Sequence, residues 1–247
     1  MAKPDWVFGL HTVTAILERH PERILELYLL EGRQDQRIEK IQKLANVHGI
    51  PCRQSSKQAL DDLVQQGNHQ GVVAKSRLAQ PLQEQQLYEL VERAASPILL
   101  LILDSVTDPH NLGACIRTAD AVGAAGVVTT RDKAVGLTPV VRRVAVGAAE
   151  VVPFFQVTNL ARTLDELKEM GVWVVGTAID ETAKSLYETD LKGNVAMVMG
   201  AEGKGIRRLT KDKCDSLVYV PMQGSVDSLN VSVATGVCLF EALRQRS

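Results

Sequence analysis

The sequence predicts an α/β protein, with a small amino-terminal α/β domain followed by a larger domain built on a mainly parallel β-sheet. After Pro97, short continuous apolar runs alternate with helical patterns, which is typical of a parallel sheet covered on both faces. A separate, shorter series of alternating elements precedes residue 78. Between them, residues 79–86 are polar and rich in glutamine, as connectors often are. We therefore expect a first domain over residues 1–77, a linker over 78–96 and a second domain over 97–247.

Hydrophobic periodicity predicts the individual elements of the first domain and of the linker. Residues 37–47 show the helical pattern clearly, because Ile38, Ile41 and Leu44 fall on one face. The predicted helices cover residues 9–18, 37–47 and 57–64, with a further helix over 83–95 in the linker. The predicted strands cover residues 24–30, 50–53 and 71–75.

The second domain is predicted as a regular alternation of strands and helices. Its predicted strands cover residues 98–103, 126–130, 154–157, 172–177, 195–199 and 217–220. Its predicted helices cover residues 112–122, 139–145, 160–170, 206–211 and 231–244. Thr158 or Asn159 can cap the third of these helices and Asn230 the last, because short polar side chains bind the free amides of a first turn.

Composition limits the class of protein. The chain has 247 residues, of which 45% are hydrophobic, enough for a sizeable core. No apolar run reaches the ~18 residues that a membrane helix needs. The first six residues lack the apolar segment of a secretion signal. We therefore expect a cytoplasmic protein with no membrane partner.

The cysteines give no sign of a disulfide framework or of a metal site. They are scattered along the chain, without a close pair and without a histidine at metal-ligand spacing. We expect reduced structural thiols at Cys52, Cys115, Cys214 and Cys238, and no bound metal.

The formal net charge of -1 is far from that of a protein that binds nucleic acid through its whole surface. Any contact with a polyanion must therefore be local. Either of two basic clusters can supply it or can simply be a solvated helix face. The clusters are Arg131, Lys133, Arg142 and Arg143, and Lys204, Arg207, Arg208, Lys211 and Lys213.

Two loops rich in small residues, 198–206 and 225–232, follow consecutive predicted strands. Open α/β sheets bind ligands at the carboxyl ends of their strands. Glycines at 200, 203 and 205 permit close approach of the backbone and positive φ angles. Glu202 would repel a phosphate, so this loop favours a cationic cofactor over a nucleotide.

A third loop, over residues 104–117, lies at a comparable strand-to-helix turn. Asn111 falls near the start of the predicted helix, where its side chain can either cap the helix or bind a ligand. Arg117 follows six residues later, so both side chains can address overlapping space. On a helix of small apolar residues this guanidinium needs an anionic partner, which can be Asp104, Glu202 or a ligand phosphate. His110 is interpreted as a polar turn residue rather than a general base.

The three loops together resemble the three motifs of the SpoU, or TrmH-type, branch of the SPOUT RNA methyltransferases. The matching segments are Asp108-Pro109-His110-Asn111-Leu112-Gly113 with Arg117, Met199-Gly200-Ala201-Glu202-Gly203, and Ser228-Leu229-Asn230-Val231-Ser232. The resemblance covers the whole chain, including Gly9-Leu10-His11 and His69-Gln70-Gly71 of the first domain. The order and spacing of the motifs are specific, and no motif position departs from the pattern.

The resemblance implies a second domain with a deep trefoil knot, a homodimer, and an RNA-binding first domain. It also implies S-adenosyl-L-methionine as the cofactor and 2′-O-methylation of a guanosine ribose in 23S ribosomal RNA as the reaction. The implied cofactor-binding residues are Thr177, Gly200, Gly205, Val220, Met222 and Leu229. The implied catalytic or substrate-positioning residues are Asn111, Arg117, Glu202, Ser228 and Asn230. The knot follows from the resemblance alone, because threaded chains are rare and the strand pattern by itself indicates an ordinary open sheet.

The implied chemistry can be judged from the residue types. A ribose 2′-hydroxyl is a poor nucleophile at neutral pH, so the site must remove its proton or stabilise the developing alkoxide. A guanidinium stays protonated in proteins, so Arg117 is a poor general base. Our interpretation is that Arg117 binds the adjacent RNA phosphate and polarises the hydroxyl, while the phosphate or a neighbouring group accepts the proton.

Three other functions remain as alternatives. The chain can methylate another ribosomal or transfer RNA nucleotide, or it can be a ribosome-binding protein without catalysis, although the intact set of Asn111, Arg117, Glu202 and Asn230 argues against the latter. A nucleotide-dependent oxidoreductase or transferase is the third. It would normally carry Gly-x-Gly-x-x-Gly after the first strand of its sheet, where this chain has only Gly113.

Overall fold

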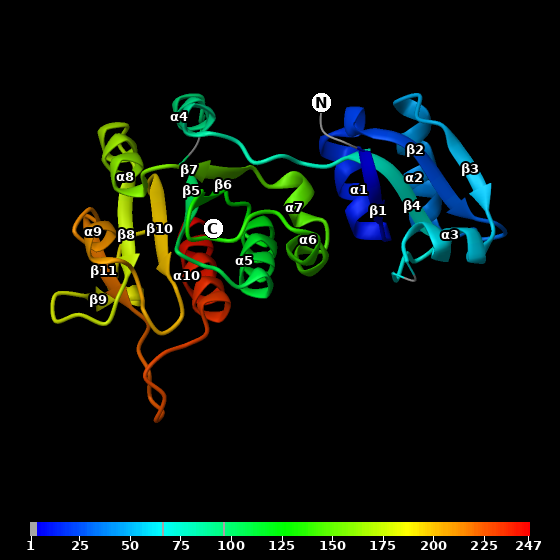
Figure 1. Ribbon diagram of the computed structural model, residues 1–247. Helices are drawn as coiled ribbons and strands as arrows, with labels where there is room; N and C mark the ends of the chain where they lie inside the picture. The colour runs from blue at the N-terminus through cyan, green and yellow to red at the C-terminus, as the bar shows by residue number, and fades with distance from the viewer. Residues whose placement is uncertain (1–3, 66, 96) are drawn as a thin grey trace. The chain divides into compact units, whose positions relative to one another are not determined.

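The computed structural model describes residues 4–65, 67–95 and 97–247. The chain divides into two compact units, shown in Figure 1. One comprises Met1–Gln80 and Val146–Val151, and the other comprises Pro81–Ala145 and Val152–Ser247. The first unit thus includes the short helix α7 (Ala148–Val151), in a segment that the sequence analysis placed within the second domain.

The first unit is built on a sheet with the strand order β1-β4-β2-β3. Its strands are β1 (Pro4–Phe8), β2 (Ile24–Leu30), β3 (Cys52–Ser55) and β4 (Val72–Arg77). Strand β4 is antiparallel to both β1 and β2, whereas β2 and β3 are parallel. The three predicted strands are confirmed, and β1 was not predicted.

The predicted helices of this unit are also confirmed as α1 (Leu10–Arg19), α2 (Gln36–Val47) and α3 (Lys57–Leu63), with a 3-10 turn at Pro21–Arg23. Helices α1 and α2 cover one face of the sheet, where apolar side chains such as Val13, Leu27 and Ile41 are fully buried. Asp35 caps α2 by accepting hydrogen bonds from the amides of Arg37 and Ile38. Helix α3 lies on the opposite face with Leu60 buried against Val73.

A buried carboxylate fixes α7 within the first unit. Glu150 is 3% exposed, and its carboxylate pairs with the guanidinium of Arg23 and accepts a hydrogen bond of 2.8 Å from the amide of Ala79. The Arg23 side chain also donates to the carbonyl of Glu150 over 2.6 Å. A buried charge requires such partners, so this cluster accounts for the position of the segment.

The predicted linker helix is present as α4 (Glu84–Glu92) and packs in the second unit. Leu87 and Val91 on α4 join the same buried cluster as Phe155. The preceding residue Leu82 exchanges backbone hydrogen bonds of 2.8 and 2.9 Å with Phe154 and Gln156. The connector is therefore anchored to the sheet of the second unit from Leu82 onward.

The sheet of the second unit is parallel at every described strand pair, in the order β7-β6-β5-β10-β8-β11-β9. Its strands are β5 (Leu99–Asp104), β6 (Gly126–Thr130), β7 (Phe154–Val157), β8 (Trp173–Thr177), β9 (Lys184–Ser185), β10 (Val195–Gly200) and β11 (Ser216–Tyr219). The mainly parallel α/β fold is confirmed. Among these described strands, only β9 was not predicted, because two residues are too few to show a period.

Helices cover both faces of this sheet (Figure 1). They are α4, α5 (Pro109–Ala121), α6 (Pro139–Ala145), α8 (Leu160–Glu169), α9 (Arg208–Lys211) and α10 (Val231–Arg246), with a 3-10 turn at Leu186–Glu188. Helices α4 and α8 bury their apolar sides against Leu100, Ile102 and Val198. Helix α10 packs against α5 and β10, and the Cys115 thiol lies 3.5 Å from the Thr235 hydroxyl between the two helices.

The predicted caps of two helices are confirmed. Asn159 caps α8 with a hydrogen bond from the amide of Arg162, and Asn230 caps α10 with one from the amide of Ser232. Because α10 packs on α5, capping at Asn230 brings the amino end of α10 close to that of α5. This arrangement determines where the predicted site residues meet.

Candidate functional site

The carboxyl edge of the parallel sheet brings together the loops that the sequence singled out. Gly200 at the end of β10 lies in register with Asp104 at the end of β5. Strand β8, which ends at Thr177, is the other neighbour of β10, and β11 follows β8 in the sheet. The loops after β5, β8, β10 and β11 therefore leave the sheet side by side, as expected for a ligand site in a parallel sheet.

A polar network joins the three motifs at this edge. The side-chain amide of Asn230 donates to the Oδ1 of Asn111 over 3.0 Å and lies 3.4 Å from the Glu202 carboxylate. The amide of Asn111 lies 3.5 Å from the same carboxylate oxygen. Glu202 is exposed, so solvent and ligands reach the network. The structure thus brings three of the five predicted catalytic residues into contact.

Capping determines which amide groups are available to the network. Asp108, not Asn111, caps α5, by accepting hydrogen bonds from the amides of His110 and Asn111. The Asn111 side chain is therefore not the helix cap and contributes to the network instead. Asn230 does both, because its Oδ1 accepts from the amide and hydroxyl of Ser232 while its Nδ2 donates to Asn111.

An ion pair between a buried carboxylate and a partly exposed arginine ties down the glycine-containing loop. Asp104 is fully buried, and its carboxylate accepts hydrogen bonds from the Arg207 Nε over 2.6 Å and from the Arg207 amide over 3.0 Å. Ser105 adds a hydroxyl at 3.1 Å. Asp104 is therefore the partner of Arg207, not of Arg117. The sequence offered a signal for this pair, since an acid at the end of an apolar strand needs a cation, but it did not identify which one.

Two predicted catalytic residues stand apart from the network. The Arg117 side chain is exposed on α5 and forms no hydrogen bond or ion pair within the part of the chain that the structure describes. The Ser228 side chain is exposed in the loop before α10 and also lacks a hydrogen bond to any described residue. Both groups are exposed to solvent, and neither is held by another described side chain.

The loop after β10 is shaped by its own backbone. Ala201 and Gly205 exchange hydrogen bonds of 2.8 and 3.2 Å, which folds the loop back on itself. A side chain at Gly200 would overlap with the backbone of Gly205 and Ile206, whereas a Cβ at Gly205 would meet open space. Gly203 and Gly205 have φ angles of 74° and 64°. Close packing of the chain on itself, rather than approach of a ligand, thus explains Gly200.

The residues predicted to bind the cofactor lie on neighbouring loops at this edge. Thr177 ends β8, and its hydroxyl donates to the carbonyl of Val198 over 3.1 Å. Val220, Met222 and Leu229 are half-buried in the segment between β11 and α10. These side chains are small or apolar and uncharged, which suits an adenine and a methionine chain, and Glu202 adds a carboxylate for a sulfonium cation. The residue types therefore fit S-adenosyl-L-methionine.

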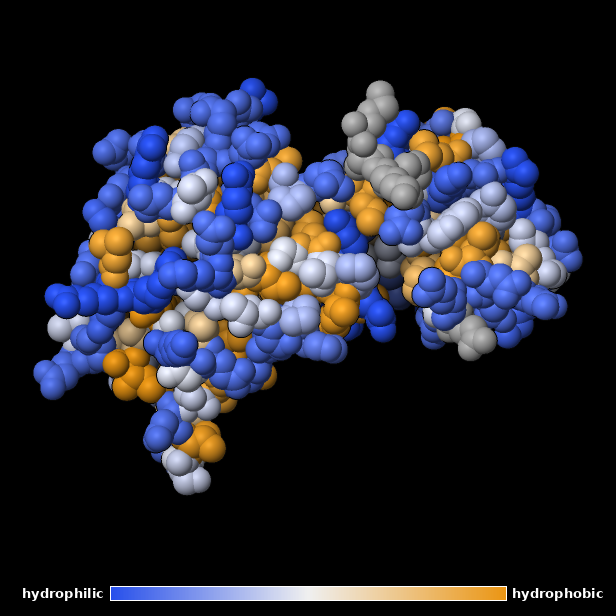
Figure 2. Space-filling model, in the orientation of Figure 1, coloured by the Kyte–Doolittle hydropathy of each residue, from blue (hydrophilic) through white to orange (hydrophobic). Residues whose placement is uncertain are grey.

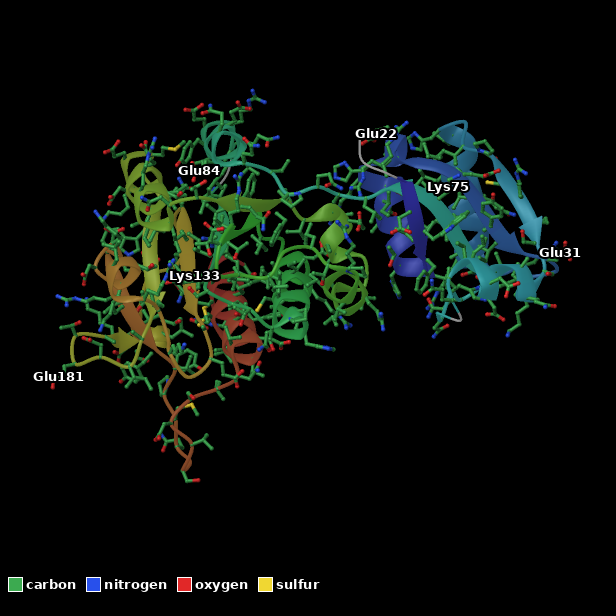
Figure 3. The ribbon with its side chains drawn as sticks, viewed as in Figure 1. Glu22, Glu31, Lys75, Glu84, Lys133 and Glu181 are labelled. Atoms are coloured by element: carbon green, nitrogen blue, oxygen red, sulfur yellow. The ribbon has the colours of Figure 1, made fainter. Side chains whose placement is uncertain are left out.

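The segment between β11 and α10 extends away from the sheet (Figure 1). Figure 2 shows the same projection as a mixture of hydrophilic and hydrophobic residues. Residues 223–228 are exposed, and they include Val226, a large apolar side chain that is 59% exposed. On the neighbouring loop between β8 and β9, Glu181 lies at the outer end (Figure 3).

Most of the second basic cluster is neutralised by carboxylates. Arg207 pairs with Asp104, Lys211 pairs with Asp180, and Lys213 pairs with Asp165 over 2.6 Å. Lysine pairing keeps the pKa of Asp180 well below its usual range. In the first cluster, Arg131, Lys133 and Arg143 are exposed. The first cluster is therefore the more available of the two for a polyanion.

Two of the four cysteines, Cys115 and Cys238, are buried, whereas Cys214 is partly buried and Cys52 is exposed. Cys52, Cys115, Cys214 and Cys238 are free, and burial raises the pKa of Cys115 to about 11 and that of Cys238 to about 12. Among the described residues, no group of three or more histidine, cysteine or acidic side chains is arranged to hold a metal. In the same residues, no helix is long and apolar enough to span a membrane.

Two family models match the chain and together cover most of it. Residues 98–240 match the SpoU rRNA Methylase family, and residues 6–82 match the domain described as RNA 2′-O ribose methyltransferase substrate binding. The matches define a two-domain RNA methylase, with a substrate-binding domain followed by a methylase domain. The chain belongs to the SpoU rRNA methylase family.

Two relatives match the chain over its whole given length. The chain is 55% identical over 246 residues to the 23S rRNA (guanosine-2′-O-)-methyltransferase RlmB of Shewanella oneidensis, covering 100% of this chain and 99% of the relative. It is 54% identical over 246 residues to the RlmB of Pseudomonas putida, covering 100% of this chain and 98% of the relative.

Solved structures show the same fold. The SpoU methyltransferase AviRb from Streptomyces viridochromogenes, solved with the cofactor AdoMet, matches with a TM-score of 0.74 at 23% identity, over 98% of this chain and 90% of that one. The TrmH/SpoU tRNA modifying enzyme of A. aeolicus matches with a TM-score of 0.57 at 31% identity, over 66% of this chain and 82% of that one.

Proposed function

We propose that this protein transfers a methyl group from S-adenosyl-L-methionine to the 2′-hydroxyl of a guanosine ribose in 23S ribosomal RNA. The observation that carries the proposal is the network of Asn111, Asn230 and Glu202 at the carboxyl edge of the sheet. It joins the three motifs of a chain that is 55% identical to an enzyme named for this reaction.

In the proposed site, each polar side chain has a role that fits its chemistry. Arg117 binds the RNA phosphate next to the target ribose and polarises the 2′-hydroxyl, because an exposed guanidinium is a two-point donor for phosphate. Asn111 orients the ribose, since its amide is held by Asn230 and Glu202. Ser228 and Asn230 fix the nucleotide or the loop that covers it. The proton passes to the phosphate or to a neighbouring group.

S-adenosyl-L-methionine, when bound, supplies an electrophilic methyl group on a sulfonium centre. The residues that would hold it are Thr177, Gly200, Gly205, Val220, Met222 and Leu229. Glu202 complements the positive charge of the sulfonium and also accepts the two amide contacts that orient Asn111 and Asn230. The second unit folds as a trefoil knot whose loops carry these residues.

The active form is a homodimer acting in the cytoplasm. Helix α10 supports the dimer, because Val233 and Phe240 are 52% and 50% exposed and lie seven residues apart, on one side of the helix. Large apolar side chains aligned on an exposed helix face indicate a protein partner, and a second copy of the chain fits a symmetric helix contact.

The experiment that tests the proposal is a methyl-transfer assay with the full chain. Protein-free 23S rRNA and methyl-labelled S-adenosyl-L-methionine are the substrates, and 16S rRNA and bulk tRNA serve as controls. We expect one labelled nucleotide, a guanosine whose 3′ phosphodiester bond resists alkaline cleavage. Label on a base, or label confined to tRNA, would contradict the proposal. Absence of binding to S-adenosyl-L-methionine in calorimetry would instead favour a ribosome-binding protein without catalysis.

A further inference from the structure

The two faces of the sheet in the first unit are covered to different extents. Helices α1 and α2 bury one face, where Val72 and Ala74 of β4 are fully buried. On the other face, only the seven-residue α3 packs among the described elements, through Leu60 and Leu63, against Val73 and Leu30. Beyond α3, this second face carries Trp6 and Tyr28, and both side chains remain partly exposed.

The register of the strands places these aromatic side chains among cations. Trp6 on β1 lies opposite Lys75 on β4, and Tyr28 on β2 lies opposite Arg53 on β3. The rings of Trp6 and Tyr28 meet edge to face, with centroids 5.5 Å apart, and the Lys75 Nζ lies 5.9 Å from the centroid of the Trp6 ring. Figure 3 labels Lys75 on this strand. We call Trp6, Tyr28, Lys75 and Arg53 the aromatic surface.

The charge of the aromatic surface favours an anionic partner. Along β4, alternation places Lys75 and Arg77 on the same face, and both are exposed. Glu26 is the acidic residue that the paired strands direct to this face, and it is engaged by the Tyr28 hydroxyl over 2.7 Å and by Arg53. On α3, which packs on the same face, Asp61 is paired with Lys57 and His69, and Asp62 is exposed.

We propose that the aromatic surface binds an unpaired base of the substrate RNA, which stacks on Trp6 while Lys75, Arg53 or Arg77 contacts its phosphates. Aromatic side chains that are partly exposed on a sheet, with flanking cations, offer the stacking and phosphate contacts by which proteins bind single-stranded RNA. The Lys75 side chain is flexible, so its ammonium can leave the ring for a phosphate when a base arrives. This inference rests on the proposed function, since it names the surface by which the first unit holds its RNA.

Intrinsic fluorescence tests the stacking directly, because the chain has two tryptophans, Trp6 and Trp173. In the full-length Trp173→Phe variant, Trp6 is the only indole. Titration of this variant with protein-free 23S rRNA, with excitation at about 295 nm, should quench Trp6 as a base stacks on it. The same titration of Trp6→Phe, in which Trp173 is the only indole, is the control and should show no specific quenching.

Binding and turnover give a second measurement. Trp6→Ala should weaken binding to 23S rRNA about tenfold, as expected for loss of one stacked base, and should leave kcat at saturating RNA unchanged. Trp6→Phe should retain most of the affinity. Val47→Ala is a matched control, because Val47 is 78% exposed on α2, on the other side of the unit. Thermal melting monitors the fold of each variant.

The outcomes separate this inference from the proposed function. RNA binding and methylation by the Trp173→Phe variant without quenching of Trp6 would overturn the aromatic surface and leave the proposed function intact. An unchanged Kd for a folded Trp6→Ala variant would overturn it as well. Quenching by an assembled ribosomal particle but not by naked RNA would indicate a protein partner and count equally against it. Failure of the wild-type chain to methylate any RNA would contradict the proposed function itself.

Discussion

The two ends of helix α10 differ in how their polar side chains are bonded and exposed. At its carboxyl end, Arg246 donates to the carbonyls of Leu191, Gly193 and Ile98 over 2.9, 2.7 and 3.1 Å. Gln245 accepts from the amide of Leu191 and donates to the carbonyl of Thr189. At its amino end, Asn230 shares an exposed network with Asn111 and Glu202, while Arg117 on the neighbouring α5 is exposed and has no partner among the described residues.

This difference separates groups that serve folding from groups that serve function. At the amino edge of the sheet, polar side chains satisfy the free carbonyls of loops and of the helix terminus, which stabilises the fold. At the carboxyl edge, polar side chains remain exposed and are only partly satisfied by one another. Substitutions at the two edges should therefore differ in what they change, stability at one and activity at the other.

The largest effect is expected at Arg117. Replacement of Arg117 by Lys keeps the charge but removes the planar two-point contact with phosphate, so kcat should fall at least about 100-fold. The free energy of unfolding should stay within about 0.5 kcal/mol, because the side chain is exposed and has no ion-pair partner among the described residues. Methyl transfer to 23S rRNA and urea denaturation measure the two quantities. Arg162→Lys, on the exposed side of α8, is the matched control. Near-normal turnover of Arg117→Lys would count against the proposed role.

The Asp104 and Arg207 pair differs from its neighbours at the carboxyl edge, because the Asp104 carboxylate is fully buried and paired, although Arg207 itself is partly exposed. Arg207→Gln leaves the Asp104 carboxylate without its main charged partner. We expect the free energy of unfolding to fall by about 2 to 3 kcal/mol. The double variant Asp104→Asn with Arg207→Gln should recover part of this loss, because the buried charge is also removed. If the single variant unfolds at the same urea concentration as the wild type, the pair does not stabilise the loop.

Much of the fold was predictable from the sequence, because strands buried on both faces are continuous apolar runs and helices have a clear apolar side. Strand β1 was missed because its apolar run of Trp6, Val7 and Phe8 is too short to show a period. Helix α7 was missed because four residues do not reveal a period. Its membership of the first unit depends on the contact between Arg23 and Glu150, which are 127 residues apart in the sequence.

The site was predictable in part. The motif spacing indicated Asn111, Glu202 and Asn230, and the contacts among them require the packing of α10 on α5, which no local pattern reveals. The sequence also treated glycines 200, 203 and 205 alike, whereas the fold gives them different roles. Gly200 is required by the close return of the chain at Gly205 and Ile206, and Gly205 faces open space. The partner of Asp104 was unresolved for the same reason, because it depends on the path of that loop.

Asn230 both caps α10 and contacts Asn111 and Glu202, and a substitution can separate these two roles. Ser is also a good helix cap, so Asn230→Ser should retain the cap of α10 and change the free energy of unfolding by less than about 0.5 kcal/mol. It removes the amide that contacts Asn111 and Glu202, so turnover should fall about tenfold, the effect of losing a hydrogen bond worth about 1.4 kcal/mol. Asn159→Ser, the same change at the cap of α8, is the matched control and should leave turnover unchanged. Equal turnover in the two variants would show that the network has no role in the reaction.

The smallest effect is expected at the carboxyl end of α10 and appears only in acid. Glu241 accepts hydrogen bonds of 2.8 Å from Arg244 and Gln245, and these contacts, that of Arg244 first, lower its pKa from 4.5 to about 2. Because the folded pKa is below the unfolded one, this stabilisation is complete above pH 4.5 and is lost as the pH falls towards 2. Glu241→Gln should therefore reduce the difference between urea midpoints at pH 7 and pH 3, while methyl transfer at pH 7 stays unchanged. An acid dependence equal to that of the wild type would show that Glu241 does not contribute to stability. A loss of turnover would show that the carboxyl end of α10 also affects activity.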